Sequence, residues 1–166
     1  MSNKNTTPGF HPIRHDRLIQ EQVHDAYKAS HKLPEPTICP QCNAIYREGR
    51  WCWGDIPKEA NHELCPACHR LNDGLPAGFV SLRGQFFMTH RKEITHLINR
   101  EEQRERKEHP LKRIMNVEQK DDEMLVTTTD IHLARGIGEA VHRAYRGELD
   151  FHYNKEENLL RVNWVH

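Results

Sequence analysis

The sequence of 166 residues lacks any apolar run close to the roughly 18 residues that a membrane span requires. Its beginning, MSNKNTTPGFHPIRHDR, also lacks the apolar stretch of a secretory signal. These absences predict a cytoplasmic protein with no membrane partner and with reduced thiols. A chain of this length has room for one domain or two small ones, and we expect two small units.

The sequence has no excess of charge of either sign, since it contains 24 Lys and Arg against 24 Asp and Glu. Binding of nucleic acid without sequence preference depends on the neutralisation of phosphates by Lys and Arg, and a balanced chain has no overall field for it. The charges are unevenly spread, because residues 85–120 are mildly basic and residues 121–166 are acidic. Any contact with nucleic acid must therefore be local.

The motifs of several enzyme classes are missing as well. There is no glycine-rich phosphate loop, no nucleophile elbow and no HExxH pattern. Two pairs can be considered as acid and base, namely Asp130 with His132 and His90 with His96. Asp130 is better explained as the cap of a helix. The two histidines of the second pair are six residues apart, which places them on different sides of a helix. We predict that the protein is not an enzyme.

The sequence does contain five cysteines, four of which form two pairs, Cys39-Pro-Gln-Cys42 and Cys65-Pro-Ala-Cys68. In such a knuckle the backbone turns so that both thiolates face one ion. The proline fixes the turn, and Asn43 can take the left-handed conformation that closes the first one. A closed site of four thiolates is the usual structural arrangement of zinc. We predict Zn²⁺ at these four cysteines, with a binding free energy of about 10–16 kcal/mol that helps to fold the segment around them.

Other interpretations of this segment stay open. Either pair alone fits a redox dithiol, although no βαβ pattern accompanies it. Iron fits the same four sulfurs, as in a rubredoxin-like electron carrier. His62 and His69 flank the second pair without sharing its spacing, so we place them at the surface or beside the ligands. In a strand through GRWCW, Cys52 points away from the side that Trp51 and Trp53 share, and we interpret it as a small buried apolar residue.

The whole sequence predicts an α+β fold in four segments. Residues 1–36 form a tail and an amphipathic helix from about Ile13 to Ala29, and residues 37–84 form a zinc-ribbon or treble-clef-like module with four cysteine ligands. Residues 85–110 form a charged connector helix. Residues 111–166 form a ββαββ domain, which is an antiparallel sheet with one helix on its apolar face. In the last segment Asp130 caps the helix and Gly147 follows its end. Gly136 and Gly138, inside that helix, indicate close packing against the sheet.

Four runs of the sequence resemble a family of small bacterial proteins with two CPxC pairs: CPQCNAIYREGRWCW, LCPACHRLNDGLPAGFVSLRG, HRKEITHLINREEQRERKEHPLKRIM and VTTTDIHLARGIGEAVHRAYRGELDF. The resemblance covers most of the chain from about Arg14 and implies no activity. The order of the parts is also distantly similar to the zinc-binding N-terminal region of the archaeal and eukaryotic adaptor that escorts the large ribosomal subunit, which differs in length and has more cysteine pairs. This likeness implies metal ligation at the four paired cysteines and a ribosome- or RNA-associated role.

We therefore expect a binding protein whose zinc knuckles present Arg47, Arg50, Trp51 and Trp53 to RNA or to a ribosomal subunit. Arginine suits phosphates, and exposed aromatic rings suit the stacking of bases. Whether the two tryptophans lie in the core or at the contact surface stays open. The alternative is an adaptor that binds a protein partner through the charged helix and the acidic C-terminal segment.

Overall fold

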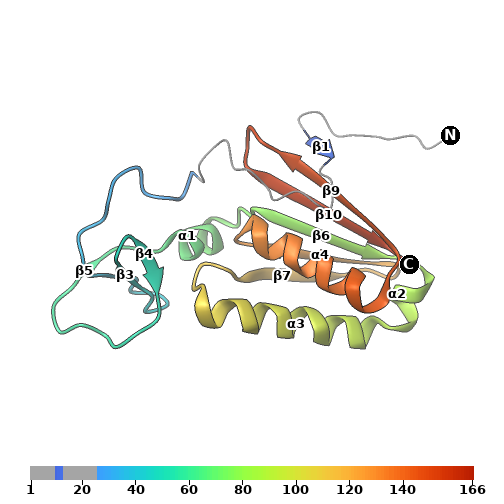
Figure 1. The fold of residues 1–166 in the computed structure, drawn as a ribbon, viewed down its shortest axis with the longest axis horizontal. Helices are drawn as coiled ribbons and strands as arrows, with labels where there is room; N and C mark the ends of the chain where they lie inside the picture. The colour runs from blue at the N-terminus through green and yellow to red at the C-terminus, as the bar shows by residue number, and fades with distance from the viewer. Residues whose placement is uncertain (1–9, 13–25) are drawn as a thin grey trace.

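The computed structural model describes residues 10–12 and 26–166 of the chain (Figure 1). Most of the predicted N-terminal helix lies outside these residues, and its described end, from Ala26 to Ala29, is not helical. Among the described residues, no helix has both the length and the apolar character that a membrane crossing needs. Four helices and two sheets make up the described fold, which confirms the predicted α+β class.

The larger sheet has six strands in the order β1-β9-β10-β6-β8-β7. Their bounds are Phe10–Pro12 for β1, Gly78–Arg83 for β6, Ile114–Gln119 for β7, Glu123–Thr128 for β8, Glu148–Asn154 for β9 and Leu159–Val165 for β10. Neighbouring strands are antiparallel except for β6 and β10, which run parallel. Since β8 lies antiparallel between β6 and β7, these strands and the helix that connects β6 to β7 form a split βαβ unit.

Two helices, α3 (Arg91–Glu108) and α4 (Ile131–Tyr145), lie side by side across one face of this sheet (Figure 1). The short helix α2 (Gln85–Thr89) leads into α3. Alternate strand residues point toward the helices and are buried, including Val80, Leu82, Val126, Val162 and Trp164. The helices contribute further apolar side chains, and together these residues form the main core.

The predicted order of two strands, a helix and two strands at the C-terminal end is confirmed by β7, β8, α4, β9 and β10. The boundaries of the domain differ from the prediction. Strand β6, which we assigned to the cysteine module, lies in the middle of the large sheet between β10 and β8. Helix α3, which we interpreted as a connector, packs against α4 and buries Ile94 and Ile98. The domain therefore extends from about residue 77 to the C-terminal end and also includes strand β1, and its sheet is mixed rather than antiparallel throughout.

The features predicted for α4 are present, with two changes. At its end the C-cap is Arg146, with φ of 64° and its N–H donating to the His142 carbonyl at 2.8 Å, and Gly147 follows this residue. The backbone N–H of Leu133 donates to Asp130 Oδ1 at 2.9 Å, so Asp130 caps the helix. A Cβ placed on Gly138 would come within 2.5 Å of a methyl carbon of Val162, so this glycine is the point where helix and sheet touch. Gly136 instead faces α3, and its nearest neighbour would be Glu101 Oε1 at 3.8 Å.

The cysteine module lies at one end of the molecule, with helix α1 between its small sheet and the large one (Figure 1). The small sheet has the order β4-β3-β2-β5, and α1 follows it. The bounds are Thr37–Ile38 for β2, Ile45–Arg47 for β3, Arg50–Cys52 for β4, Asn61–His62 for β5 and Pro66–Asp73 for α1. The module thus consists of a knuckle, a hairpin and a helix that begins in the second cysteine pair, which matches the treble-clef-like form of the prediction.

Candidate metal centre

The sulfur atoms of Cys39, Cys42, Cys65 and Cys68 all lie within 4.8 Å of one another. Three of these residues are buried and Cys42 is half-buried. None of the cysteines, all of which fall within the described residues, forms a disulfide. The two predicted pairs therefore come together as one group of four thiol ligands that can hold a metal ion.

The first pair is positioned by a tight knuckle between β2 and β3. The N–H of Asn43 donates to the Cys39 carbonyl at 2.9 Å, and the N–H of Cys39 donates to the Ala44 carbonyl at 2.8 Å. Asn43 has φ of 65°, the left-handed conformation expected from the sequence. This closed loop directs the side chains of Cys39 and Cys42 toward the second pair.

The second pair is positioned by the start of α1. Cys65 is the N-cap of this helix, and its Sγ accepts a hydrogen bond from the N–H of Cys68 at 3.4 Å. Pro66 occupies the first helical position, where its missing N–H costs nothing. The N-terminal end of a helix favours negative charge, so this placement favours the thiolate forms that bind metals.

An arginine from the large sheet domain reaches into the cysteine cluster. Arg113, directly before β7, donates from Nη1 to Cys68 Sγ at 3.3 Å and from Nη2 to Cys42 Sγ at 3.0 Å and Cys65 Sγ at 3.4 Å. Its Nε donates to the Pro110 carbonyl at 2.8 Å. Only 5% of this residue is exposed to solvent. Arg113 belongs to no motif of the sequence, and its side chain joins the metal module to the sheet domain.

The charges of Arg113 and of the cysteine thiols stabilise each other in the cluster. Burial opposes the charge of Arg113, but its hydrogen bond to Cys68 and the charges of Cys42 and Cys65 outweigh burial and raise its pKa. The hydrogen bond between Cys65 and Cys42, with their sulfurs 3.8 Å apart, lowers the pKa of Cys42 to about 4. The same hydrogen bond raises the pKa of Cys65. Arg113 therefore remains a cation beside at least one thiolate, the form in which cysteine binds a metal.

The fifth cysteine lies outside this group. Cys52 is half-buried, and its sulfur lies 3.4 Å from the Ile45 carbonyl across the hairpin. His62 is exposed, and His69 is half-buried with its ring centroid 6.1 Å from that of Tyr27. Neither histidine belongs to the group of possible metal ligands found among the described residues.

The two tryptophans of the module have different surroundings. Trp51 is half-buried, packs on the apolar cluster that contains the metal ligands, and meets the ring of Tyr46 edge to face at 5.6 Å. Trp53 is 36% exposed, and its Nε1 donates to the Arg106 carbonyl in the last turn of α3 at 2.6 Å. One tryptophan therefore covers the metal centre, and the other links the module to the sheet domain.

The two arginines proposed for contact lie on either side of the turn between β3 and β4. Glu48 and Gly49 form this turn with φ of 51° and 77°. Arg47 and Arg50 are exposed, and neither has an ion pair within the described part of the chain. The hairpin therefore carries two cations with their charges open to solvent.

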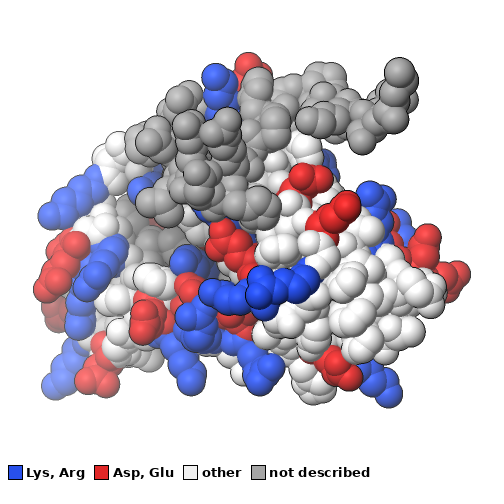
Figure 2. Space-filling model, turned by 45° about the vertical axis from the view of Figure 1, so that its right-hand side comes forward, with Lys and Arg blue, Asp and Glu red and all other residues white. Residues whose placement is uncertain are grey.

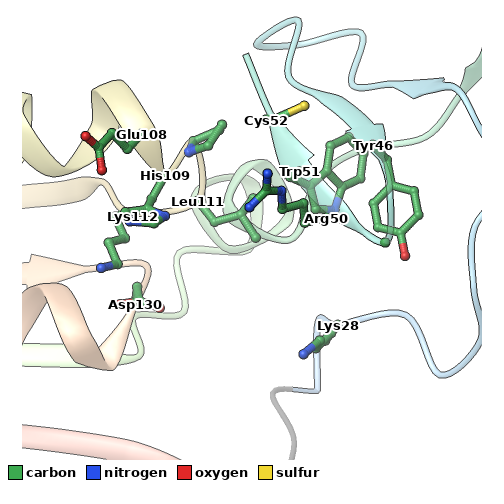
Figure 3. A pocket seen from close by; sticks show the side chains of 12 residues that line it. Lys28, Tyr46, Arg50, Trp51, Cys52, Glu108, His109, Leu111, Lys112 and Asp130 are labelled. Atoms are coloured by element: carbon green, nitrogen blue, oxygen red, sulfur yellow. The ribbon is translucent and has the colours of Figure 1, made fainter. Parts of the chain in front are cut away.

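A cleft of about 680 Å³ lies between this hairpin and the sheet domain (Figure 3). The hairpin contributes one wall with residues from Tyr46 to Cys52, and the other wall comes from Glu108 to Lys112 and from Asp130. Lys28 lies at its edge. Two of the residues predicted for contact, Arg50 and Trp51, line this cleft, whereas Arg47 and Trp53 do not.

The four thiols can thus hold a metal ion, and the cleft lies beside them. Four thiolates complete a tetrahedral coordination sphere, so an ion held here has no position left for a reacting water or substrate. Comparison of the chain with protein-family models, with curated proteins and with solved structures found no match.

Proposed function

We propose that the protein is a zinc-binding, RNA-associated protein in which a structural ion shapes the surface that contacts RNA. The observation that carries the metal is the cluster of four thiol ligands within 4.8 Å, with no carboxylate or imidazole in the group among the described residues. Zinc is favoured because a closed tetrahedral set of four thiolates is its usual structural site. Since such a site is closed, we also propose that the protein is not an enzyme.

Iron is the alternative ion, because the same four sulfurs accept it. The two ions are separated by elemental analysis of the purified chain together with its visible spectrum. We expect about one zinc per chain and no visible absorption. A stoichiometric iron content with a coloured spectrum would replace the zinc proposal by an electron carrier.

RNA is supported by the open cations of the hairpin and by the aromatic rings beside them. Arg47 and Arg50 have no ion pair within the described part of the chain, and Trp51 is only half-buried. Basic and acidic side chains are interspersed over the face that Figure 2 shows. This face therefore has no large basic patch for RNA, as the equal numbers of basic and acidic residues in the sequence predict. A local contact at the hairpin fits this distribution.

A protein partner is the second candidate, and one observation favours it. Trp53 and Ile56 leave 36% and 62% of their surfaces exposed within a few residues of each other in the loop after β4. A contiguous exposed apolar patch is typical of protein contact sites, and these two side chains could contribute to one. The same binding experiment distinguishes the two candidates.

The test is binding of the metal-loaded chain to a single-stranded RNA oligonucleotide and to ribosomes, measured over a series of salt concentrations. We expect binding that weakens as salt rises, because phosphate contacts release counterions. Retention of the chain in the light fractions of a low-salt gradient, together with no oligonucleotide binding, would refute the RNA proposal. A protein that co-purifies through the loop after β4, and is lost in a variant with polar residues at Trp53 and Ile56, would support the second candidate.

A further inference from the structure

The cleft between the β3–β4 hairpin and the sheet domain, here called the interface cleft, has the size and lining of a ligand site (Figure 3). Its volume of about 680 Å³ lies within the roughly 300–1,000 Å³ of typical ligand pockets. Neither unit forms it alone, because its walls come from both. It adjoins the metal centre but contains none of the four metal ligands.

One wall of the interface cleft is aromatic. Tyr46 and Trp51 line it from neighbouring strands, where they are register partners, and their rings lie at an interplanar angle of 65°. Both residues are half-buried, and Trp51 packs on the apolar cluster that contains the metal ligands. Aromatic rings held in this way are the platforms on which unpaired bases stack, at about 1–3 kcal/mol per base.

The cleft also carries cations that form no ion pair with the acids among the described residues. Arg50 and Lys28 line it, and neither forms an ion pair within the part of the chain that the structure describes. Figure 3 shows Arg50 between the aromatic wall and the opposite wall. Lys112 is a third cation, engaged by Glu105 at 2.9 Å.

Two acids line the cleft as well, and they limit the ligands that fit. Asp130 uses its carboxylate to cap α4, so part of its charge is already engaged. Glu108, at the end of α3, is exposed to solvent. The open cations therefore lie with the aromatic rings and at the edge, whereas the acids lie on the opposite wall. An anionic ligand with an aromatic ring matches this division better than an acidic peptide, which needs cations but no ring platform.

We propose that the interface cleft binds an unpaired nucleotide of single-stranded RNA, with its base against Tyr46 and Trp51 and its phosphate on Arg50 and Lys28. This inference rests on the proposed RNA function and assigns it to a site. It gives the RNA a contact that both units of the protein form, so the metal module and the sheet domain act on one ligand.

The opposite wall is held to the metal centre through Arg113. The Thr129 hydroxyl donates to the Leu111 carbonyl at 2.6 Å, and the Thr129 N–H donates to the Arg113 carbonyl at 2.9 Å. The side chain of Arg113 in turn donates to three of the four sulfurs. Removal of the metal is therefore expected to weaken binding in the cleft, even though no ligand atom reaches the ion.

The test uses fluorescence anisotropy of the metal-loaded full chain with a labelled single-stranded RNA of eight nucleotides. Arms with double-stranded RNA of the same sequence and with poly-glutamate separate the ligand classes. Variants Tyr46→Leu and Arg50→Gln probe the ring and the cation, and Arg143→Gln on the exposed side of α4 is the matched control. Metal content and circular dichroism of each variant show that it is folded, and Arg50 is exposed enough for its variant to fold even where Tyr46→Leu does not.

We expect Tyr46→Leu to weaken single-strand binding roughly 5- to 150-fold, the range of one lost base stack. The slope of log K against log salt is negative, and Arg50→Gln should make it shallower by about 0.7, the contribution of one phosphate contact on a single strand. Arg143→Gln should bind as the wild type does. Wild-type binding of RNA by both folded cleft variants would overturn the assignment to the cleft and leave the RNA function standing. No RNA binding by the metal-loaded wild type, or preference for poly-glutamate, would overturn the RNA function and the cleft assignment together.

Discussion

Replacement of Arg113 by methionine is expected to weaken both metal binding and the junction between the two units. The substitution removes a guanidinium that is 5% exposed and donates to Cys42, Cys65 and Cys68, while it keeps an unbranched side chain in the same space. A divalent ion with four thiolates carries a net negative charge, which then stays buried without its cation. Removal of one partner of a buried ion pair typically costs about 3–5 kcal/mol.

This loss divides into a part that needs the metal and a part that does not. Groups that orient metal ligands usually contribute about 10–100-fold in metal affinity, which corresponds to about 1.4–2.8 kcal/mol. The carbonyl of Pro110 also loses its donor, and an unsatisfied buried acceptor costs about 1–3 kcal/mol whether or not the ion is bound. The two parts together agree with the range for a broken buried pair.

The assay is a zinc competition titration against a coloured chelator, combined with urea unfolding in the presence and absence of metal. We expect zinc affinity to fall about 10–100-fold in Arg113→Met. Arg113→Lys should lose less, because an ammonium keeps the charge but lacks the planar fork that reaches several sulfurs. Arg143→Met, on an exposed site of α4, should change stability by no more than about 0.5 kcal/mol. A methionine variant with the zinc affinity of the wild type would refute the role of these hydrogen bonds.

Three further predictions concern single residues. Cys42→Ser should abolish stoichiometric metal binding, whereas Cys52→Ser should keep it. Elemental analysis measures the metal content of both variants, and metal loss in Cys52→Ser would contradict the ligand assignment. Gly138→Ala should destabilise the fold by about 1–3 kcal/mol because the added Cβ has no space. Gly136→Ala should stabilise the fold by about 0.5–1 kcal/mol, because its Cβ has space and alanine favours the helix. Urea unfolding measures both variants, and equal effects would contradict the packing. Asp130→Ala should lower the free energy of unfolding by about 0.5–2 kcal/mol, because the helix cap is lost. Asp130→Asn keeps the cap and removes only the charge. Equal losses of stability for the two variants in thermal unfolding would contradict the capping role.

The parts of the fold that the sequence predicted are those with local signals. The spacing within each CxxC pair and the residue that follows it specify a knuckle without reference to the rest of the chain. The alternation of Leu149, Phe151 and Tyr153, and the cap at Asp130, likewise define β9 and α4 from adjacent residues. Each of these features needs only a few neighbouring positions to be recognised.

The parts that the sequence did not predict depend on distant pairing. Arg113 lies 45 to 71 residues from the sulfurs that it contacts, and a single arginine has no periodic pattern that would distinguish it. Strand β6 has the alternation of a strand in Val80 and Leu82, but its partners are β8 and β10, which follow much later. Since it follows the second cysteine pair after only one short helix, α1, we assigned its residues to the cysteine module. The interface cleft is hidden for the same reason, because its two walls are separate in the chain.

The pairing of β1 with β9, and of β6 with β8 and β10, has a consequence for how the cysteine module is attached. The polypeptide belongs to the same sheet before and after the module, so the module is an excursion anchored at both ends. An unfolded loop with tethered ends gains less chain entropy than a free arm, so the ion has less disorder to offset than in an independent zinc finger. A fragment cut at residues 37–84 would carry the central strand of the sheet away with it. The smallest unit that can be expressed intact is therefore the sheet together with its insertion.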